Sequence, residues 1–87
     1  MYVIIAYDVN VERVNRVKKF LRKYLHWVQN SVFEGELTEA DLEEIKIGLR
    51  EIINEEEDMI VIYRLRSADV MRREVMGVEK SNIEEFI

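Results

Sequence analysis

Asp8 is the residue of this sequence best placed to take part in chemistry. It follows the apolar run Tyr2 to Tyr7 directly and precedes Asn10, a residue type typical of a helix N-terminus. A carboxylate held at the end of a rigid strand is a suitable ligand for a hard cation such as Mg²⁺. An aspartate in this position can equally form an Asx turn or cap the next helix, and the sequence leaves both roles open.

Other catalytic constellations are poorly supported. His26 is the single histidine and there is no cysteine, so the common zinc sites and Cys–His nucleophiles are excluded, and we expect His26 in a turn between a helix and a strand. Ser31 lies in no GxSxG motif and has no histidine at suitable spacing, which argues against a hydrolase triad. Asp8 alone is a weak metal site, but a two-fold axis near the ends of the first strands would bring two copies together.

The composition predicts one small folded domain. The chain has 87 residues, no cysteine and no proline, with 48% hydrophobic and 36% charged residues, which excludes a disulfide scaffold and a multi-domain enzyme. Its first apolar run is far too short to span a bilayer and lacks the features of a signal peptide, so we expect a cytoplasmic protein without a membrane partner. A domain this short is marginally stable alone, which favours oligomerisation.

The charge is distributed unevenly around a net value of −5. Residues 11–25 are strongly basic with Glu12 as the single acid, whereas residues 34–58 are strongly acidic. Such asymmetry can direct one surface toward polyanions, although two helices with solvated charged faces would give the same pattern. The basic residues that we expect to bind nucleic-acid backbone are Arg13, Arg16, Lys19, Lys23, Arg64 and Arg66.

Hydrophobic periodicity predicts an α+β fold. Alternating and continuous apolar runs indicate strands, and three- and four-residue spacing indicates amphipathic helices. Thr38 followed by Asp41 resembles a capping box at the start of the second helix. We predict strands at 2–7, 28–36, 59–65 and 70–76, and helices at 11–25 and from 38 to about 54. We interpret this as the ferredoxin-like βαββαβ sandwich over residues 1–77, with 2–7 and 59–65 as central strands and 78–87 as a C-terminal tail.

The pattern also predicts a two-fold homodimer packed through the sheets. Both helices of a βαββαβ unit lie on one face of the sheet, yet residues 2–7 and 59–65 carry apolar side chains on both faces. A second copy is the expected cover of the other face. The tail, with Ile83, Phe86 and Ile87, could pack on its own dimer or reach the partner's edge strand.

Two segments resemble a known family. Tyr7-Asp8-Val9 after the first strand and the QxSVFEG segment at residues 29–35, together with the length and element order, resemble the CRISPR-associated Cas-two family over essentially the whole chain. The resemblance implies a ferredoxin-like homodimer that acts in spacer acquisition and antiviral defence with a CRISPR integrase of the Cas-one type. It further implies a metal-dependent endonuclease for RNA or double-stranded DNA, in which Asp8 is the catalytic residue and binds magnesium.

The resemblance also assigns roles around Asp8. Tyr7, Ser31 and Phe33 would support the site, and Arg16 matches the family's helix arginine. Trp27 stands where many relatives have an arginine, so an expected phosphate contact becomes an indole that could stack on a base or pack. No general base is evident, which leaves open a non-catalytic scaffold that bridges integrase subunits on DNA. A ferredoxin-like regulatory dimer for a small ligand is a third, weaker alternative.

Overall fold

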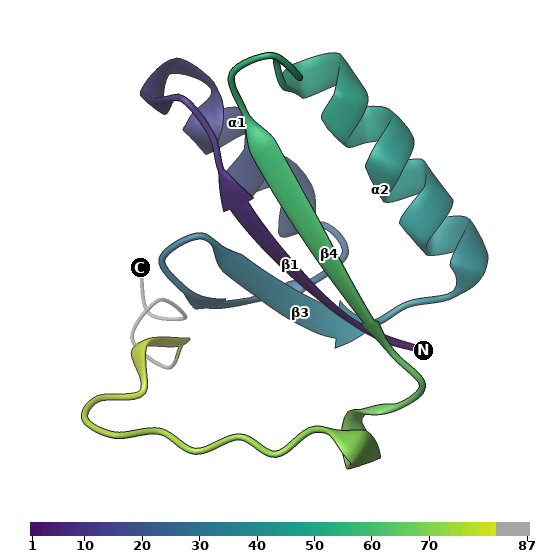
Figure 1. Cartoon of the computed structure of the whole chain (residues 1–87), viewed down its shortest axis with the longest axis vertical. Helices are drawn as coiled ribbons and strands as arrows, with labels where there is room; N and C mark the ends of the chain where they lie inside the picture. The colour runs from purple at the N-terminus through teal and green to yellow at the C-terminus, as the bar shows by residue number, and fades with distance from the viewer. Residues whose placement is uncertain (82–87) are drawn as a thin grey trace.

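Two helices cover one face of a four-stranded antiparallel sheet (Figure 1). The structure, a computed structural model, describes residues 1–81. The elements are β1 (Tyr2–Asp8), α1 (Val11–Leu21), β2 (His26–Gln29), β3 (Val32–Glu36), α2 (Glu39–Ile52) and β4 (Met59–Leu65), followed by a short 3₁₀ turn, Ala68–Val70. The strand order is β2-β3-β1-β4. The predicted ferredoxin-like α+β fold with its βαββαβ order is confirmed, although two of the four predicted strands were assigned to the wrong residues.

The core lies between the helices and one face of the sheet. Alternate residues of β1, namely Val3, Ile5 and Tyr7, are buried, as the two-residue period of a strand requires. Phe33 lies opposite Ile5 in the neighbouring strand. The helices contribute the stripes that their spacing predicts: Val17 and Leu21 from α1, and Leu42, Ile45 and Leu49 from α2.

Both helix starts follow the predicted capping chemistry. The Asn10 side chain accepts a hydrogen bond from the backbone N–H of Glu12 at 3.2 Å. Thr38 and Asp41 form a reciprocal capping box, with N···O distances of 3.0 and 3.1 Å. Asn10 therefore caps α1, and Asp8 does not.

The predicted strand at 28–36 is wrong in its extent, because this region is a hairpin. β2 and β3 pair with each other, and the turn between them contains Asn30 with a φ of 36°. Asparagine tolerates this left-handed conformation better than other residues with a side chain, which permits a tight reversal without glycine. His26, expected in a turn, is the first residue of β2.

The predicted strand at 70–76 is also wrong within the described chain. The prediction placed one strand between the two helices and two after the second, whereas the structure has two strands between the helices and one after the second. Residues 71–76 pair with no strand of residues 1–81, and a strand is stabilised only through such pairing. The run at 59–65, expected at the centre, forms the edge strand β4 beside β1.

The first helix is shorter than predicted. α1 ends at Leu21, and the chain continues to Leu25 in turns closed by hydrogen bonds from the N–H groups of Tyr24 and Leu25 to the carbonyl of Leu21. Lys23 therefore lies beyond the helix.

The face of the sheet opposite the helices is partly open. Met59 and Tyr63 of β4 are 59% and 55% exposed on this face. The extended chain after β4 turns back beneath the sheet in Figure 1, and Arg73, Val75 and Val78 line a pocket with Ile4 and Val32. No helix within residues 1–81 is long and apolar enough to cross a membrane. The tail residues Ile83, Phe86 and Ile87, for which we predict a packing role, lie outside the described residues.

Candidate metal and nucleic-acid site

Asp8 stands at the end of β1 with an exposed side chain. It lies opposite Met59, the first residue of β4. Its carboxylate makes no hydrogen bond or ion pair with any other residue of the described chain. Residues 1–81 contain no cluster of three or more His, Cys, Asp and Glu side chains that could hold a metal ion. A free carboxylate fits Mg²⁺, which is commonly bound through one or two carboxylates and several waters, but one chain supplies a single ligand.

The support for Asp8 comes from the hairpin turn and from a buried ring pair. The backbone N–H of Tyr7 donates to the carbonyl oxygen of Ser31 at 3.0 Å, which fixes the turn against the end of β1. The rings of Tyr7 and Phe33 stack with centroids 6.2 Å apart and an angle of 25° between their planes. Tyr7 directly precedes Asp8, and Ser31 and Phe33 contact Tyr7, so any support that they give Asp8 passes through Tyr7. Their supporting role stays a prediction.

The Tyr7 hydroxyl is held in its neutral form. Burial raises the pKa of Tyr7 above its ordinary value, and the side-chain hydrogen bond with Ser31 and the charge of Arg22 oppose this only in part. Tyr7 is 7% exposed, so it anchors the strand end and does not face solvent beside Asp8.

Arg13 does not have the surface position that its place in the basic segment predicts. Its guanidinium binds the carboxylate of Asp58, with Nε 2.6 Å from Oδ2 and Nη2 3.0 Å from Oδ1, and its side chain is only 15% exposed. It also contacts Glu12 and Glu57. Arg13 is thus an internal ion-pair partner whose charge is engaged by Asp58 and not presented to nucleic acid.

The remaining basic residues form two separate groups. Arg16 and Lys19 are exposed on α1, and Lys23 follows it with its ammonium 6.0 Å from the Phe20 ring centroid. Arg64 lies near the opposite end of the sheet from Asp8, about 17 Å along β4 from Met59 at the usual rise per residue, and Arg66 follows the strand. Arg64 pairs with Glu39. Within one chain, the structure does not bring Arg64 and Arg66 to Asp8.

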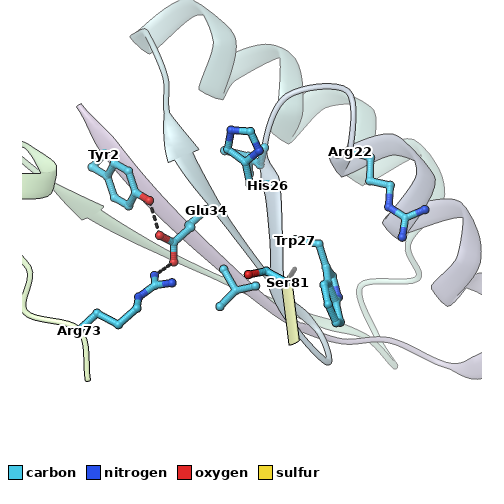
Figure 2. Close-up of a pocket in the computed structure, with 9 residues that line it drawn as sticks. Tyr2, Arg22, His26, Trp27, Glu34, Arg73 and Ser81 are labelled. Carbon is cyan, nitrogen blue, oxygen red and sulfur yellow. Dashed lines mark hydrogen bonds and ion pairs between the residues drawn. The ribbon is translucent and has the colours of Figure 1, made fainter. Parts of the chain in front are cut away.

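A pocket of 470 Å³ lies beside β2 and is lined by several polar side chains (Figure 2). Its lining includes Arg22, His26 and Trp27. Glu34 is buried at the pocket wall and accepts hydrogen bonds from the Tyr2 hydroxyl and from Arg73. The sequence does not distinguish Glu34 from the other acids of residues 34–58, because its burial arises only in the folded chain.

Trp27 has a packing role. Its indole N–H donates to the carbonyl of Asn30 at 3.0 Å, which closes the hairpin turn. The Lys18 ammonium lies 5.5 Å from the centroid of its ring. Of the two possibilities for this indole, base stacking or packing, the described contacts favour packing.

The fold and the site together define a class of small ferredoxin-like α+β proteins with an aspartate at the end of the first strand and basic residues along the first helix. Comparison with known proteins identifies the family. The family model described as CRISPR associated protein Cas2 matches residues 1–73. This chain belongs to the CRISPR-associated Cas2 family, as its sequence resemblance implied.

Several relatives are similar over nearly the whole chain. A protein of Archaeoglobus fulgidus named CRISPR-associated endoribonuclease Cas2 2 is 80% identical over 80 residues, covering 92% of this chain and 87% of its own. A CRISPR-associated endoribonuclease Cas2 of Thermococcus kodakarensis is 66% identical over 87 residues, and all of both chains is covered. These names describe the relatives' activity.

Solved structures agree with the fold. A crystal structure of a Cas2 protein superposes with a TM-score of 0.84 at 52% identity, covering 93% of this chain and 91% of that chain. Streptococcus pyogenes Cas2 superposes with a TM-score of 0.77 at 39% identity, covering 88% of this chain and 100% of that chain.

Proposed function

We propose that this protein is a Mg²⁺-dependent endonuclease of CRISPR antiviral defence that cleaves RNA, with Asp8 as the metal ligand. The exposed carboxylate of Asp8, free of partners within residues 1–81 and held at a fixed strand end, carries this proposal. The relatives that are named endoribonucleases favour RNA over double-stranded DNA as the substrate.

A homodimer completes the proposed site. One chain supplies one carboxylate, and a two-fold axis near the ends of β1 would add the partner's copy. The exposed Met59 and Tyr63 on the open sheet face support this arrangement, because an uncovered apolar face of a small domain favours association.

The residues of the chain have distinct parts in the proposed reaction. Asp8 holds the cation, while Tyr7, Ser31 and Phe33 keep the strand end rigid. Arg16 and Lys19, with Lys23 beyond the helix, bind the phosphate backbone and position it without reading sequence. When bound, Mg²⁺ supplies Lewis-acid polarisation of the phosphodiester and a lowered pKa for a coordinated water.

Cleavage by wild-type protein and by Asp8→Ala tests this function. Defined single-stranded RNA and duplex DNA are incubated with highly purified protein, with Mg²⁺ and with a chelator. We expect Mg²⁺-dependent cleavage of RNA by the wild type and none by Asp8→Ala, with the dimer intact by light scattering. Equal cleavage by the variant would refute the metal site.

A second candidate is a non-catalytic scaffold that holds DNA between subunits of a Cas-one type integrase. The absence of a metal-binding cluster or an evident general base in the described chain favours it. In both candidates the protein acts in spacer acquisition in the cytoplasm. The scaffold becomes the better account if the purified protein binds duplex DNA with steep salt dependence but cleaves neither nucleic acid.

A further inference from the structure

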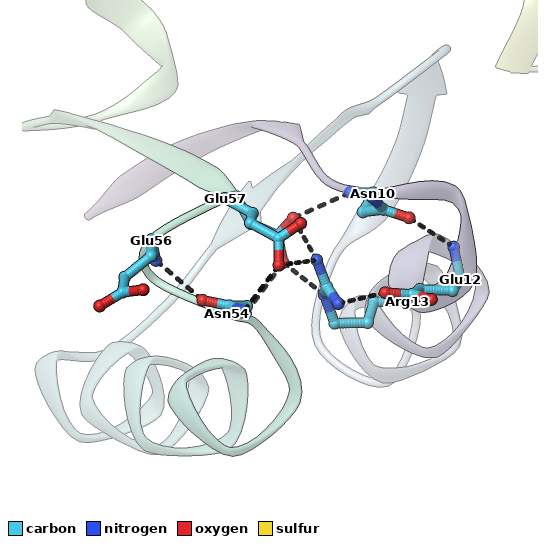
Figure 3. A network of polar contacts seen from close by, with 7 residues as sticks. Asn10, Glu12, Arg13, Asn54, Glu56 and Glu57 are labelled. Carbon is cyan, nitrogen blue, oxygen red and sulfur yellow. Dashed lines mark hydrogen bonds and ion pairs between the residues drawn. The ribbon is translucent and has the colours of Figure 1, made fainter.

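Asp58 is a buried carboxylate whose oxygens accept hydrogen bonds from the start of α1 and from the chain just after α2. Its side chain is 0% exposed. Oδ1 accepts from the backbone N–H of Asn10 at 2.9 Å and from Arg13 at 3.0 Å. Oδ2 accepts from Arg13 at 2.6 Å and from the backbone N–H of Asn54 at 2.9 Å. Figure 3 shows Asn10, Arg13 and Asn54 gathered around one network of polar contacts, between the start of α1 and the chain that follows α2.

This network holds two segments next to Asp8, namely the loop that follows it and the start of the strand that pairs with it. Asn10 follows Asp8 by two residues, so its bond to Asp58 fixes the chain where it leaves β1. Asp58 immediately precedes Met59, which is the residue paired with Asp8 in the β1–β4 ladder. The same carboxylate therefore holds the chain just after Asp8 and the start of the strand that pairs with it.

We propose that Asp58 is a positioning residue for Asp8, acting through Asn10 and Arg13 to fix the loop that directly follows Asp8 at the end of β1. This inference rests on the proposed metal-binding role of Asp8. It gives Arg13 a function in the site without contact with nucleic acid.

A carboxylate that only stabilised the start of a helix would not need to come from a distant part of the chain. The start of α2 is capped locally, by the reciprocal hydrogen bonds between Thr38 and Asp41. The start of α1 has its own cap in Asn10 and yet also engages a buried charge from a distant part of the chain. Buried ion pairs are weak contributors to stability compared with apolar packing. The four hydrogen bonds that Asp58 accepts nevertheless hold Asn10, Arg13 and Asn54 in one arrangement. Imposing one geometry is what a metal ligand at the end of a strand requires.

Asp58→Asn tests the proposal, with Asp41→Asn as the matched control. Both variants replace a carboxylate that accepts the backbone N–H of a helix N-cap residue, Asn10 or Thr38, by its isosteric amide, but only Asp58 is bonded to the loop after Asp8. The primary measurement is NMR line broadening of the Asp8, Val9 and Asn10 amides by Mn²⁺, which requires no activity. The second is the Mg²⁺ concentration for half-maximal RNA cleavage, compared with kcat at saturating Mg²⁺.

We expect Asp58→Asn to need about ten-fold more metal in both measurements, the size typical of altered partners behind a metal ligand. Cleavage should recover at high Mg²⁺, whereas Asp41→Asn should match the wild type even if its Tm falls. Arg13→Lys provides a milder variant should Asp58→Asn not fold, because it retains the charge but loses the two-pronged bond, and it should shift metal binding in the same direction.

The outcomes separate this inference from the proposed function. Saturable broadening at Asp8 in the wild type with unchanged metal dependence in Asp58→Asn and Arg13→Lys would overturn the positioning role alone. No saturable broadening at Asp8 in the wild type would overturn the metal site and the positioning role together.

Discussion

Arg13 and Asp58 are 45 residues apart in the chain, yet Nε of Arg13 lies 2.6 Å from Oδ2 of Asp58. One residue comes from the strongly basic segment and the other from the strongly acidic segment. Part of the charge asymmetry is therefore neutralised inside the molecule, where it joins the start of α1 to the start of β4. The basic surface that residues 11–25 offer to a polyanion is correspondingly reduced to the exposed residues of α1 and the turns that follow it.

The ion pair predicts acid sensitivity. The hydrogen bond from Arg13, with those from the backbone of Asn54 and Asn10, holds the pKa of Asp58 well below its ordinary value. A depressed pKa adds stability above the unfolded pKa of about 3.9, and this contribution is lost as the pH falls toward the folded pKa. The Tm should therefore fall less steeply with decreasing pH below about pH 4 for Asp58→Asn than for the wild type. Parallel curves of Tm against pH for the two proteins would show that Asp58 is not the source of the acid sensitivity.

Charge reversal on α1 should weaken nucleic-acid binding without regard to sequence. For each phosphate that Arg16→Glu or Lys19→Glu leaves without its cation, the slope of log K against log salt should become shallower by about 0.7 for single strands and 0.9 for duplex DNA. Titrations of two unrelated sequences at several salt concentrations measure this. Arg50→Glu, an exposed basic residue on acidic α2, is the matched control and should leave the slope unchanged. Unaltered affinity for the α1 variants would favour a merely solvated face.

The open sheet face should be a dimer interface. Light scattering at micromolar concentration should give twice the chain mass of 10.5 kDa. Tyr63→Asp should produce a folded monomer. Tyr63 is 55% exposed in the single chain, so the charge of the introduced carboxylate becomes costly only when association buries it. Ile47→Asp, at a side chain 58% exposed on α2, should leave the dimer intact. A wild-type monomer at this concentration would remove the basis for a shared metal site.

Gly48 should tolerate no larger residue. A Cβ at Gly48 would collide with the ring of Phe20, where α2 packs against α1. Gly48→Ala gains about 1 kcal/mol of helix propensity but forces repacking, which costs about 1–3 kcal/mol, so a net loss is expected. Ala40→Gly in the exposed first turn of α2 provides a comparison in which only the propensity changes. Urea unfolding measures both, and a more stable Gly48→Ala would show that the ring moves aside without cost.

The sequence by itself determined the elements whose patterns are local. The buried alternation of β1, the apolar stripes of both helices, the Asn10 cap and the Thr38–Asp41 capping box depend on residues a few positions apart, and short-range patterns predict each of them. The same local information identified Asp8 as a carboxylate at a strand end. Family membership also followed from short contiguous segments.

The tertiary structure decided everything that depends on pairing between distant segments. Whether a run of apolar residues is a central or an edge strand depends on which ladders form, and β4 is an edge strand although its sequence is nearly as apolar as that of β1. The 70–76 segment has strand character but no partner among residues 1–81, and Asn30 divides a predicted single strand into a hairpin. Asp58 and Glu34 became special only through burial, since a buried carboxylate must find donors and an exposed one need not.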